Sequence, residues 1–217
     1  MSRPRSDARR QALLTAASRV IASQGLGATT AAIAKEAGVS NGALFLYFET
    51  KADLVNELFV ALKTEMGRAA LNGLPAVAQP RGQLLHMWTH WLKWATSHPD
   101  SRRALAQLQV SDVITPRSHE AVGSASRAIA DLLERARTGG PVRDAPLGFV
   151  LALTNAIADT AVDAMLHNPQ GADALSAVAF QALWCVLAGQ PSPAPPEPSP
   201  KHSARRTPPR RSQEVSP

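Results

Sequence analysis

The amino-acid sequence predicts an all-α protein, with an N-terminal three-helix helix-turn-helix domain and a larger helical domain, about nine helices in total. Two observations lead to this fold class. Alanine and leucine dominate the hydrophobic residues, which make up 45% of the 217 positions, while runs of β-branched residues are scarce. Helix start and stop signals also recur along the chain, with apolar residues at helical spacing between them.

Capping residues place the first helices. Asp7 is a suitable N-cap for the first helix, Thr29 or Thr30 for the second and Ser40 for the third. Gly38 is expected to end the second helix. The predicted bounds of the nine helices are about 7–23, 30–37, 40–48, 51–71, 81–97, 100–111, 116–137, 146–167 and 172–188.

Positive charge is concentrated at the two ends of the chain. Residues 1–51 carry seven Lys and Arg against three Asp and Glu, residues 52–190 carry eleven against twelve, and residues 191–217 carry five against two. A basic segment beside a compact helix pair favours a polyanionic partner such as DNA, although basic segments are also common as solvated arms. Residues 1–6 are expected to form a disordered basic arm, and the proline-rich residues 190–217 a disordered tail.

Several features favour a cytoplasmic protein. Cys185 is the single cysteine, which excludes an intramolecular disulfide and fits a reducing compartment. The N-terminal residues lack the apolar stretch of a secretory signal. The longest apolar run, from Leu147, contains Asp159 and Asp163, and charges within such a run argue for a core helix and against a membrane span.

The stretch ATTAAIAKEAGVSNGALFLYF, residues 28–48, joins two short helices at a tight corner. Gly38 can adopt the left-handed conformation that a three-residue turn requires, and Val39 can fill the inside of the corner. Ile33 and Leu44 have the spacing of a small core shared by two crossed helices. This pattern is typical of a helix-turn-helix motif, whose second helix projects toward a major groove. The alternative is a helical hairpin packed only for stability.

Residues 25–58 resemble the DNA-binding domain of the TetR/AcrR family of prokaryotic transcriptional regulators. The resemblance implies a helix-turn-helix DNA-binding domain at residues 7–50 and a helical effector-binding and dimerisation domain at residues 51–189. The residues that carry the match are Thr29-Thr30, Ile33-Ala34, Ala37-Gly38-Val39-Ser40, Phe45-x-Tyr47-Phe48, Lys51 and Leu54.

The resemblance also implies which residues contact DNA. The amide of Asn41 can pair with adenine and Ala43 can touch a thymine methyl group, so the side-chain chemistry agrees. Phe45 replaces the tyrosine that is usual in the family and lacks its hydroxyl. Arg9 and Arg10, with the arm before them, offer further phosphate contacts. The residues expected on phosphates are Thr29, Thr30, Ser40, Tyr47 and Lys51, and those expected at base edges are Asn41, Gly42, Ala43 and Phe45.

The second domain is expected to hold an apolar or aromatic effector. Three tryptophans recur at three-residue steps, close to one face of a helix, and could form the wall of a pocket. Two polar residues on an otherwise apolar helix could hydrogen-bond a ligand. Alternatively, the tryptophans fill the core and the polar residues lie at an exposed edge. The candidate ligand-binding residues are Met66, Met87, Trp88, Trp91, Trp94, Asn155 and Asp159.

The last two predicted helices are apolar nearly all round and rich in alanine, so they need a partner surface. The resemblance implies a homodimer through these helices, which would read a palindromic operator in double-stranded DNA. We expect no catalytic residue, metal or cofactor, because the sequence contains no phosphate loop, nucleophile elbow or metal-ligand cluster beyond the pair His86 and His90. The predicted function is a ligand-responsive repressor. The alternatives are an effector-independent regulator and an enzyme on a helical scaffold.

Overall fold

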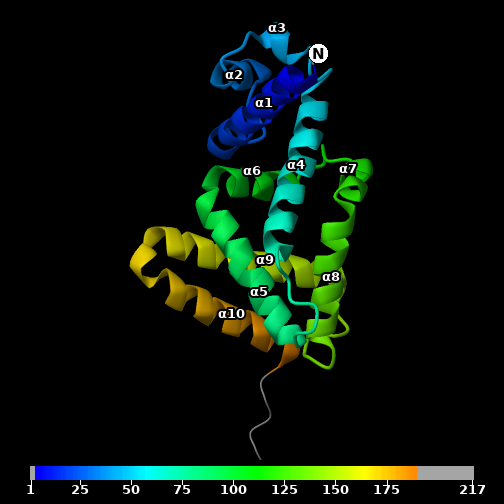
Figure 1. The fold of residues 1–217 in the computed structure, drawn as a ribbon, viewed down its shortest axis with the longest axis vertical. Coiled ribbons are helices and arrows are strands. Elements are labelled where there is room, and N and C mark those ends of the chain that lie inside the picture. Colours follow the sequence, from blue (N-terminus) through cyan, green and yellow to red (C-terminus); the bar gives the residue numbers. More distant parts are fainter. Residues whose placement is uncertain (1–2, 190–217) are drawn as a thin grey trace, which may run out of the picture.

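The computed structural model describes residues 3–189, which contain ten α-helices, one 3-10 helix and no strand (Figure 1). The predicted all-α fold is confirmed. The predicted tail, residues 190–217, and the first two residues of the predicted arm lie outside the described residues. The elements are α1 (Arg3–Gln24), α2 (Thr30–Glu36), α3 (Asn41–Leu44), α4 (Lys51–Leu71), α5 (Pro80–Ser97), α6 (Pro99–Gln109), α7 (Pro116–Ala121), α8 (Gly123–Arg137), α9 (Leu147–His167), η1 (Pro169–Gly171) and α10 (Ala172–Ala188).

The helices form an elongated bundle with α1, α2 and α3 at one end. Helix α4 runs from that end into the body of the molecule, where it packs against α1, α5, α6, α7 and α8. Helices α9 and α10 form a hairpin through η1 and pack together on the far side of α5 and α8. The candidate DNA-binding helices α1–α3 therefore lie at one end of the helical body, and α9 and α10 lie at the other.

Helix α1 begins earlier than the sequence predicts. It starts at Arg3, so Asp7 lies inside the helix and is not its N-cap. Proline is tolerated in a first helical turn, and the arginines and alanines that follow are good helix formers, so the helix continues toward the N-terminus. The prediction of a disordered arm is therefore wrong for residues 3–6.

The helix predicted at residues 116–137 is two helices, α7 and α8. Gly123 stands at their junction with a backbone φ of +43°, outside the range of a right-handed helix. Because glycine has no Cβ, the chain can change direction there at little steric cost. A capping pattern alone does not reveal this break, since a single glycine inside a helical pattern is often tolerated.

Helix α4 begins at Lys51, as predicted, and its start is closed by a capping box. The Thr50 hydroxyl accepts from the Asp53 backbone N–H at 3.1 Å, and the Asp53 carboxylate accepts from the Thr50 backbone N–H at 3.0 Å. These two bonds satisfy backbone donors that the first turn leaves free. They hold the junction between the first three helices and α4 in one conformation.

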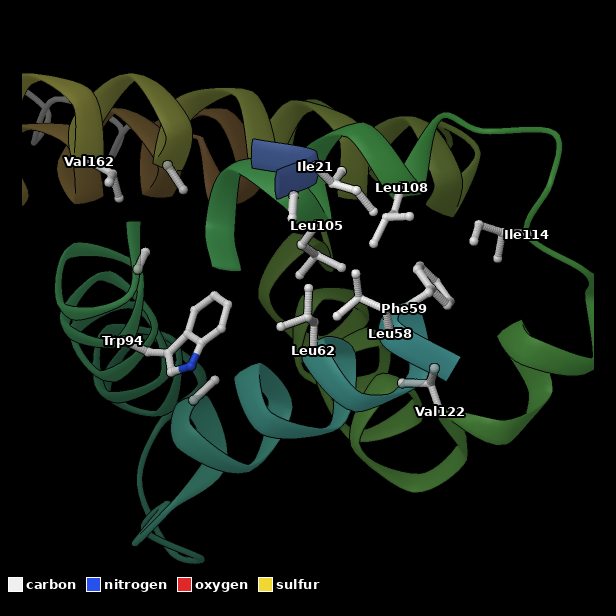
Figure 2. Packing of buried hydrophobic residues seen from close by; sticks show 14 of the residues in the cluster. Ile21, Leu58, Phe59, Leu62, Trp94, Leu105, Leu108, Ile114, Val122 and Val162 are labelled. Carbon is white, nitrogen blue, oxygen red and sulfur yellow. The ribbon is translucent and has the colours of Figure 1, made fainter. Parts of the chain in front are cut away.

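The two predicted domains share one hydrophobic core (Figure 2). Ile21 of α1 lies beside Leu105 and Leu108 of α6, and these contact the α4 side chains Leu58 and Leu62. Such interiors are close-packed, so the displacement of one helix is felt by its neighbours. Helix α6 is therefore a mechanical link between the helix-turn-helix domain and the rest of the protein.

Candidate functional site

The corner between α2 and α3 has helix-turn-helix geometry. Gly38 adopts a φ of +69°, as predicted, and its backbone N–H donates to the carbonyl of Lys35 at 3.1 Å. The N–H of Val39 donates to the carbonyl of Ala34 at 2.9 Å, which ends α2 and starts the turn. The side chain of Val39 is half-buried against the core, while Ile33 and Leu44 are fully buried.

Two of the predicted phosphate contacts are also the helix caps. The Thr29 hydroxyl accepts from the N–H of Ala32 at 3.1 Å and caps α2. The Ser40 hydroxyl accepts from the N–H of Ala43 at 3.2 Å and caps α3. A capping hydroxyl uses an oxygen lone pair and keeps its own O–H, so both side chains can still donate to a phosphate. Thr30, which begins α2, is half-buried.

Helix α3 is shorter than predicted. It covers Asn41–Leu44, and the chain then continues as turns to Tyr47. Asn41, Gly42 and Phe45 are exposed, and Ala43 and Tyr47 are half-buried. Their inward-facing neighbours are buried, as the sequence predicts for Leu44 and Phe48.

Leu46 is an exposed residue of this surface that the sequence interpretation missed. Its side chain is 83% exposed. It lies between two predicted DNA-contacting positions, Phe45 and Tyr47. The sequence carries no clear signal for this exposure, because residues 43–48 are nearly all apolar.

Lys51 and Arg10 have structural contacts that the sequence did not reveal. The Lys51 ammonium donates to the carbonyl of Leu26 at 2.7 Å, which ties the start of α4 to the loop after α1. The ammonium has three donors, so this bond leaves two for a phosphate. Arg10 forms a bidentate ion pair with Glu57 and donates to the carbonyl of Tyr47 at 3.2 Å.

Arg10 therefore connects α1 to α4 and to the end of the α3 segment. Its guanidinium also lies 4.8 Å from the centroid of the Phe48 ring. The hydrogen bond and the charge of Glu57 raise the pKa of Arg10. These bonds use three of the five N–H donors of Arg10, so any phosphate contact by this residue is limited to the remaining two.

The predicted ligand residues surround two small cavities in the second domain. One, of about 40 Å³, lies between α4, α5, α8 and α9 and is lined by Met66, Met87, Trp91 and Asn155. Its other walls are apolar, apart from Thr154. The second, of about 20 Å³, lies between α4, α5, α6 and α9. Six of the seven predicted residues line one or both cavities: Met66, Met87, Trp91, Trp94, Asn155 and Asp159.

Trp88 is the predicted ligand residue that lines neither cavity. Its side chain is fully buried, and its indole N–H donates to the Ser176 hydroxyl at 3.2 Å. Its ring lies 6.3 Å from that of Phe180, so it joins α5 to α10. Trp94 instead donates to the Glu65 carboxylate of α4 at 3.0 Å. The three tryptophans thus point to different neighbours. For Trp88, the alternative that it fills the hydrophobic core is correct.

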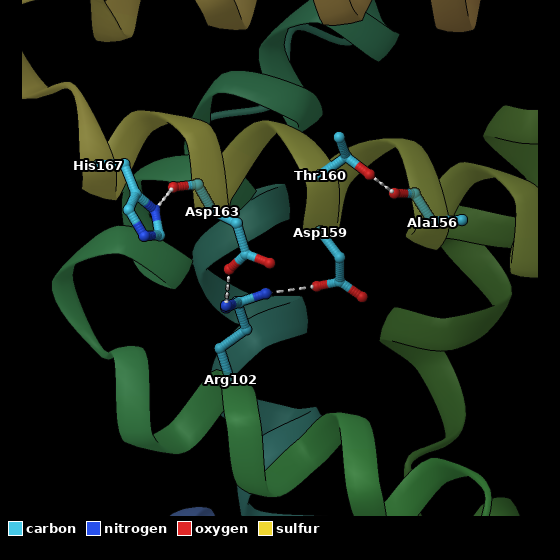
Figure 3. Close-up of polar contacts among 6 residues, drawn as sticks. All are labelled: Arg102, Ala156, Asp159, Thr160, Asp163 and His167. Atoms are coloured by element: carbon cyan, nitrogen blue, oxygen red, sulfur yellow. Dashed lines mark hydrogen bonds and ion pairs between the residues drawn. The ribbon is translucent and has the colours of Figure 1, made fainter.

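Arg102 of α6 holds two carboxylates of α9 (Figure 3). One guanidinium nitrogen donates to Asp159 at 3.0 Å, and another forms an ion pair with Asp163. The Arg102 side chain is 12% exposed and lines the smaller cavity. Asp159 is therefore both a cavity residue and an ion-pair partner. The sequence contains the two acids one helical turn apart, but only the fold brings Arg102 to them.

The remaining polar candidates have local partners. The rings of His86 and His90 stack with their centroids 4.0 Å apart. Nε2 of His86 lies 2.8 Å from the carbonyl oxygen of Asn72, and Nδ1 of His90 lies 2.9 Å from the carbonyl oxygen of His86. Within residues 3–189, no group of three or more His, Cys, Asp and Glu side chains is arranged to hold a metal ion.

Helices α9 and α10 are long and apolar enough to cross a membrane by length and composition alone. In the most apolar windows of Leu147–His167 and Pro169–Ala188, 28% and 17% of the residues are buried inside the chain. The exposed positions form a continuous stripe along each helix. They include Phe149, Ala152, Ala156, Thr160, Asp163 and Leu166 of α9, and Asp173, Ala174, Ala177, Val178, Gln181 and Ala182 of α10.

Lys63 of α4 gives the protein a testable pH dependence. Burial lowers the pKa of its ammonium from 10.5 to about 8, and its amine donates to Gln109 at 2.6 Å. Between these pKa values the unfolded chain holds a proton that the folded chain has lost, so the free energy of unfolding rises with pH. From pH 7 to pH 10, we expect the free energy of unfolding of the wild type to rise by about 1–2 kcal/mol more than that of Lys63→Met.

Urea unfolding at both pH values measures this difference. Lys93→Met is the matched control, because Lys93 is exposed on α5 and should leave the wild-type pH dependence unchanged. Parallel pH curves for wild type and Lys63→Met would contradict the assignment.

Comparison with known proteins agrees with this geometry. Residues 13–58, which span α1 to the first turns of α4, match the family model described as bacterial regulatory proteins of the tetR family. A TetR family transcription regulator from Shewanella sp. PV-4 is 24% identical with a TM-score of 0.72, and the match covers 83% of this chain and 98% of that chain.

Two further solved structures share the fold. A TetR family transcription regulator from Marinobacter aquaeolei VT8 is 24% identical, with a TM-score of 0.70 over 87% of this chain and 100% of that chain. The transcriptional regulator FadR from Bacillus subtilis, in complex with stearoyl-CoA, is 18% identical, with a TM-score of 0.59 over 83% of this chain and 98% of that chain.

The corner at Gly38 and the helical body behind it define a helix-turn-helix transcriptional regulator. Residues 13–58 match the DNA-binding domain of the TetR family, as the sequence resemblance predicted, and the described chain shares its overall fold with solved TetR family regulators.

Proposed function

We propose that the protein is a homodimeric, ligand-responsive repressor that binds a palindromic operator. The observation that carries the proposal is the exposed surface of the α2–α3 corner, where Asn41, Gly42 and Phe45 lie outside a well-packed motif. In this arrangement Asn41, Gly42, Ala43 and Phe45 meet base edges in the major groove. Thr29, Thr30, Ser40, Tyr47 and Lys51 hold the flanking phosphates.

The exposed stripes of α9 and α10 support a homodimer. They are rich in alanine, and small side chains let helices from two subunits approach closely. They also carry Phe149 and Val178, whose side chains are 56% and 70% exposed, and exposed large apolar side chains favour a partner surface. We infer that α9 and α10 of two subunits pair as a four-helix bundle, so that two α3 segments meet major-groove faces about 34–36 Å apart.

The same helices do not need a membrane in this arrangement. Asp159 and Asp163 are on α9 and their counter-ion Arg102 comes from α6, so a bilayer-spanning α9 would lose a charge pair that the fold provides. A second subunit covers the apolar stripes without this loss. We therefore propose a cytoplasmic protein.

We propose an apolar or aromatic effector that enters the cavities between α4, α5, α8 and α9. Met66, Trp91 and Asn155 line both cavities, so movement of these side chains would join the two spaces. Methionine is flexible and adapts readily to a new occupant. The FadR structure with stearoyl-CoA shows that a related fold can hold a molecule with a long apolar chain.

Release from DNA would pass through α6. Arg102 connects this helix to α9, and Gln107 donates to the carbonyl of Ile21 in α1 at 3.2 Å. An effector that displaces α6 therefore moves α1 and with it the α2–α3 corner. Coupling requires that the effector bind the two arrangements with different affinity. A difference of about 2 kcal/mol would change operator occupancy about thirtyfold.

Selection of the purified protein on random duplex DNA, at two salt concentrations, tests the proposal. Enrichment of a palindrome with half-sites about one helical turn apart supports a dimeric reader. Binding without sequence preference that disappears at higher salt would show only the electrostatic attraction of a basic surface, and the central claim would fail.

The Arg102 link leads to a stability prediction. Arg102→Met leaves Asp159 and Asp163 close together without a counter-ion, so we expect the free energy of unfolding to fall by about 1–3 kcal/mol. Adding Asp159→Asn and Asp163→Asn to this variant should restore most of the loss, because the uncompensated charges are then removed.

Urea unfolding of the variants gives these values. Arg103→Met, an exposed neighbour on α6, is the matched control and should change the free energy of unfolding by less than about 0.5 kcal/mol. Equal effects of Arg102→Met and Arg103→Met would disprove a structural role for the ion pairs.

A further inference from the structure

A third cavity lies outside the proposed effector site, at the junction of α1, α4 and the corner where α5 meets α6. Its volume is about 260 Å³, which suits a small organic molecule. Leu14, Leu58 and Leu62 provide an apolar floor, and polar side chains from all four helices form the rim. An occupant of this space would touch the DNA-binding domain and the second domain at once.

Ser18 of α1 is the first sign that the cavity is built for a polar group. The residue is 5% exposed and lines the cavity. Its hydroxyl oxygen is buried and has no hydrogen-bond partner among residues 3–189. Buried hydroxyls are normally hydrogen-bonded, because losing water without a replacement partner is unfavourable. If the Ser18 side chain turned toward the cavity, a polar group there would provide that partner.

The charged groups of the rim favour a cation. Two carboxylates, Glu65 of α4 and Asp100 of α6, line the cavity. Arg19 also lines it, but its guanidinium is already paired with Glu36 at 3.4 Å. The rim therefore carries excess negative charge, and an occupant with a positive charge would be attracted to it.

The hydrogen-bonding groups of the rim agree with this charge. One Glu65 oxygen accepts from the Trp94 indole at 3.0 Å, and its second oxygen can accept from an occupant. His98 lies with Nδ1 3.0 Å from the carbonyl of Trp94. Its Nε2 lies 3.9 Å from Oε1 of Glu65, so the imidazole stands beside this carboxylate. The free Glu65 oxygen and the Ser18 hydroxyl oxygen are both acceptors, which suits an occupant that supplies N–H donors.

We propose that this junctional cavity binds a small ammonium compound with an apolar body. The ammonium group lies at Glu65, the Ser18 side chain turns to accept from an N–H, and the hydrocarbon part rests on the leucine floor. Trp94 separates the two sites, since its ring lines the smaller effector cavity while its indole N–H holds Glu65. Any effect of the occupant on DNA binding rests on the proposed function, but its binding to the cavity does not.

Isothermal titration of the full chain with phenethylamine, which is an ammonium at about pH 7, tests the proposal. Phenethyl alcohol and phenylacetate are the neutral and anionic probes of similar size. We expect a dissociation constant of about 1 mM or lower for the amine, and binding at least about tenfold weaker for the other two probes.

Variants place the binding in the cavity. Glu65→Gln keeps an acceptor for Trp94 but removes the charge, and should weaken amine binding about tenfold. Ser18→Ala should weaken it about threefold. Glu120→Gln, an exposed carboxylate on α7 outside the cavity, is the control and should bind as the wild type does. Absence of binding at about 10 mM amine, equal affinity for phenylacetate, or full affinity in Glu65→Gln would each overturn the proposal.

Discussion

Replacing Gly42 by aspartate is expected to weaken operator binding by about 100-fold or more, without unfolding the protein. Gly42 is exposed in the first turn of α3, and a Cβ at this position would meet no atom within 4 Å. A carboxylate near a helix N-terminus is favourable for the fold. The same carboxylate would face base edges and phosphates, where its charge is repelled.

Gly42→Asn separates charge from size. It adds a side chain of almost the same shape without the charge, so we expect a loss of affinity at least about tenfold smaller than with aspartate. Fluorescence anisotropy with the selected operator measures affinity, and thermal unfolding checks the fold. Operator affinity of Gly42→Asp equal to that of the wild type would mean that α3 does not face the DNA.

Trp88→Ala is expected to lower the free energy of unfolding by about 3–5 kcal/mol, the largest stability effect we predict. The ring is fully buried between α5 and α10. Its removal leaves a large cavity and deprives the Ser176 hydroxyl of a partner. Urea unfolding with an unchanged m-value would show that the loss lies in the folded state.

Trp91→Ala is the matched comparison, since Trp91 comes from the same helix but is half-buried and lines both small cavities. We expect a loss of about 1–2 kcal/mol, because part of the ring is already in contact with open space. The variant should also change effector affinity, whereas Trp88→Phe should not. Equal stability losses for Trp88→Ala and Trp91→Ala would contradict this division between core and cavity.

The local features of the DNA-binding domain could be read from the sequence because they depend on neighbouring residues. Ser40 caps α3, Gly38 takes a positive φ, and Leu44 and Phe48 point inward, as predicted. Each of these follows from the chemistry of a short segment, such as a hydroxyl near a free N–H or a glycine at a tight turn. Helix type and order were predictable for the same reason.

The ends of some helices were less predictable. The helix expected at residues 116–137 is interrupted at Gly123, and α3 ends at Leu44 well before Phe48. Helix propensities differ by less than 1 kcal/mol for most residues, so the packing around a segment decides where it stops. The same small differences in propensity explain why the sequence predicts an arm at residues 3–6, where α1 continues instead.

The all-α fold, the helix-turn-helix corner and the family resemblance of the N-terminal domain all follow from local sequence patterns. The three-dimensional packing was needed to show that Arg10 pairs with Glu57 and that Arg102 joins α6 to α9. It was also needed to show that Trp88 belongs to the core while Trp91 lines the cavities. These pairings join residues far apart in the chain. A periodic pattern shows which face of a helix is apolar, but the partner of that face depends on how the helices pack.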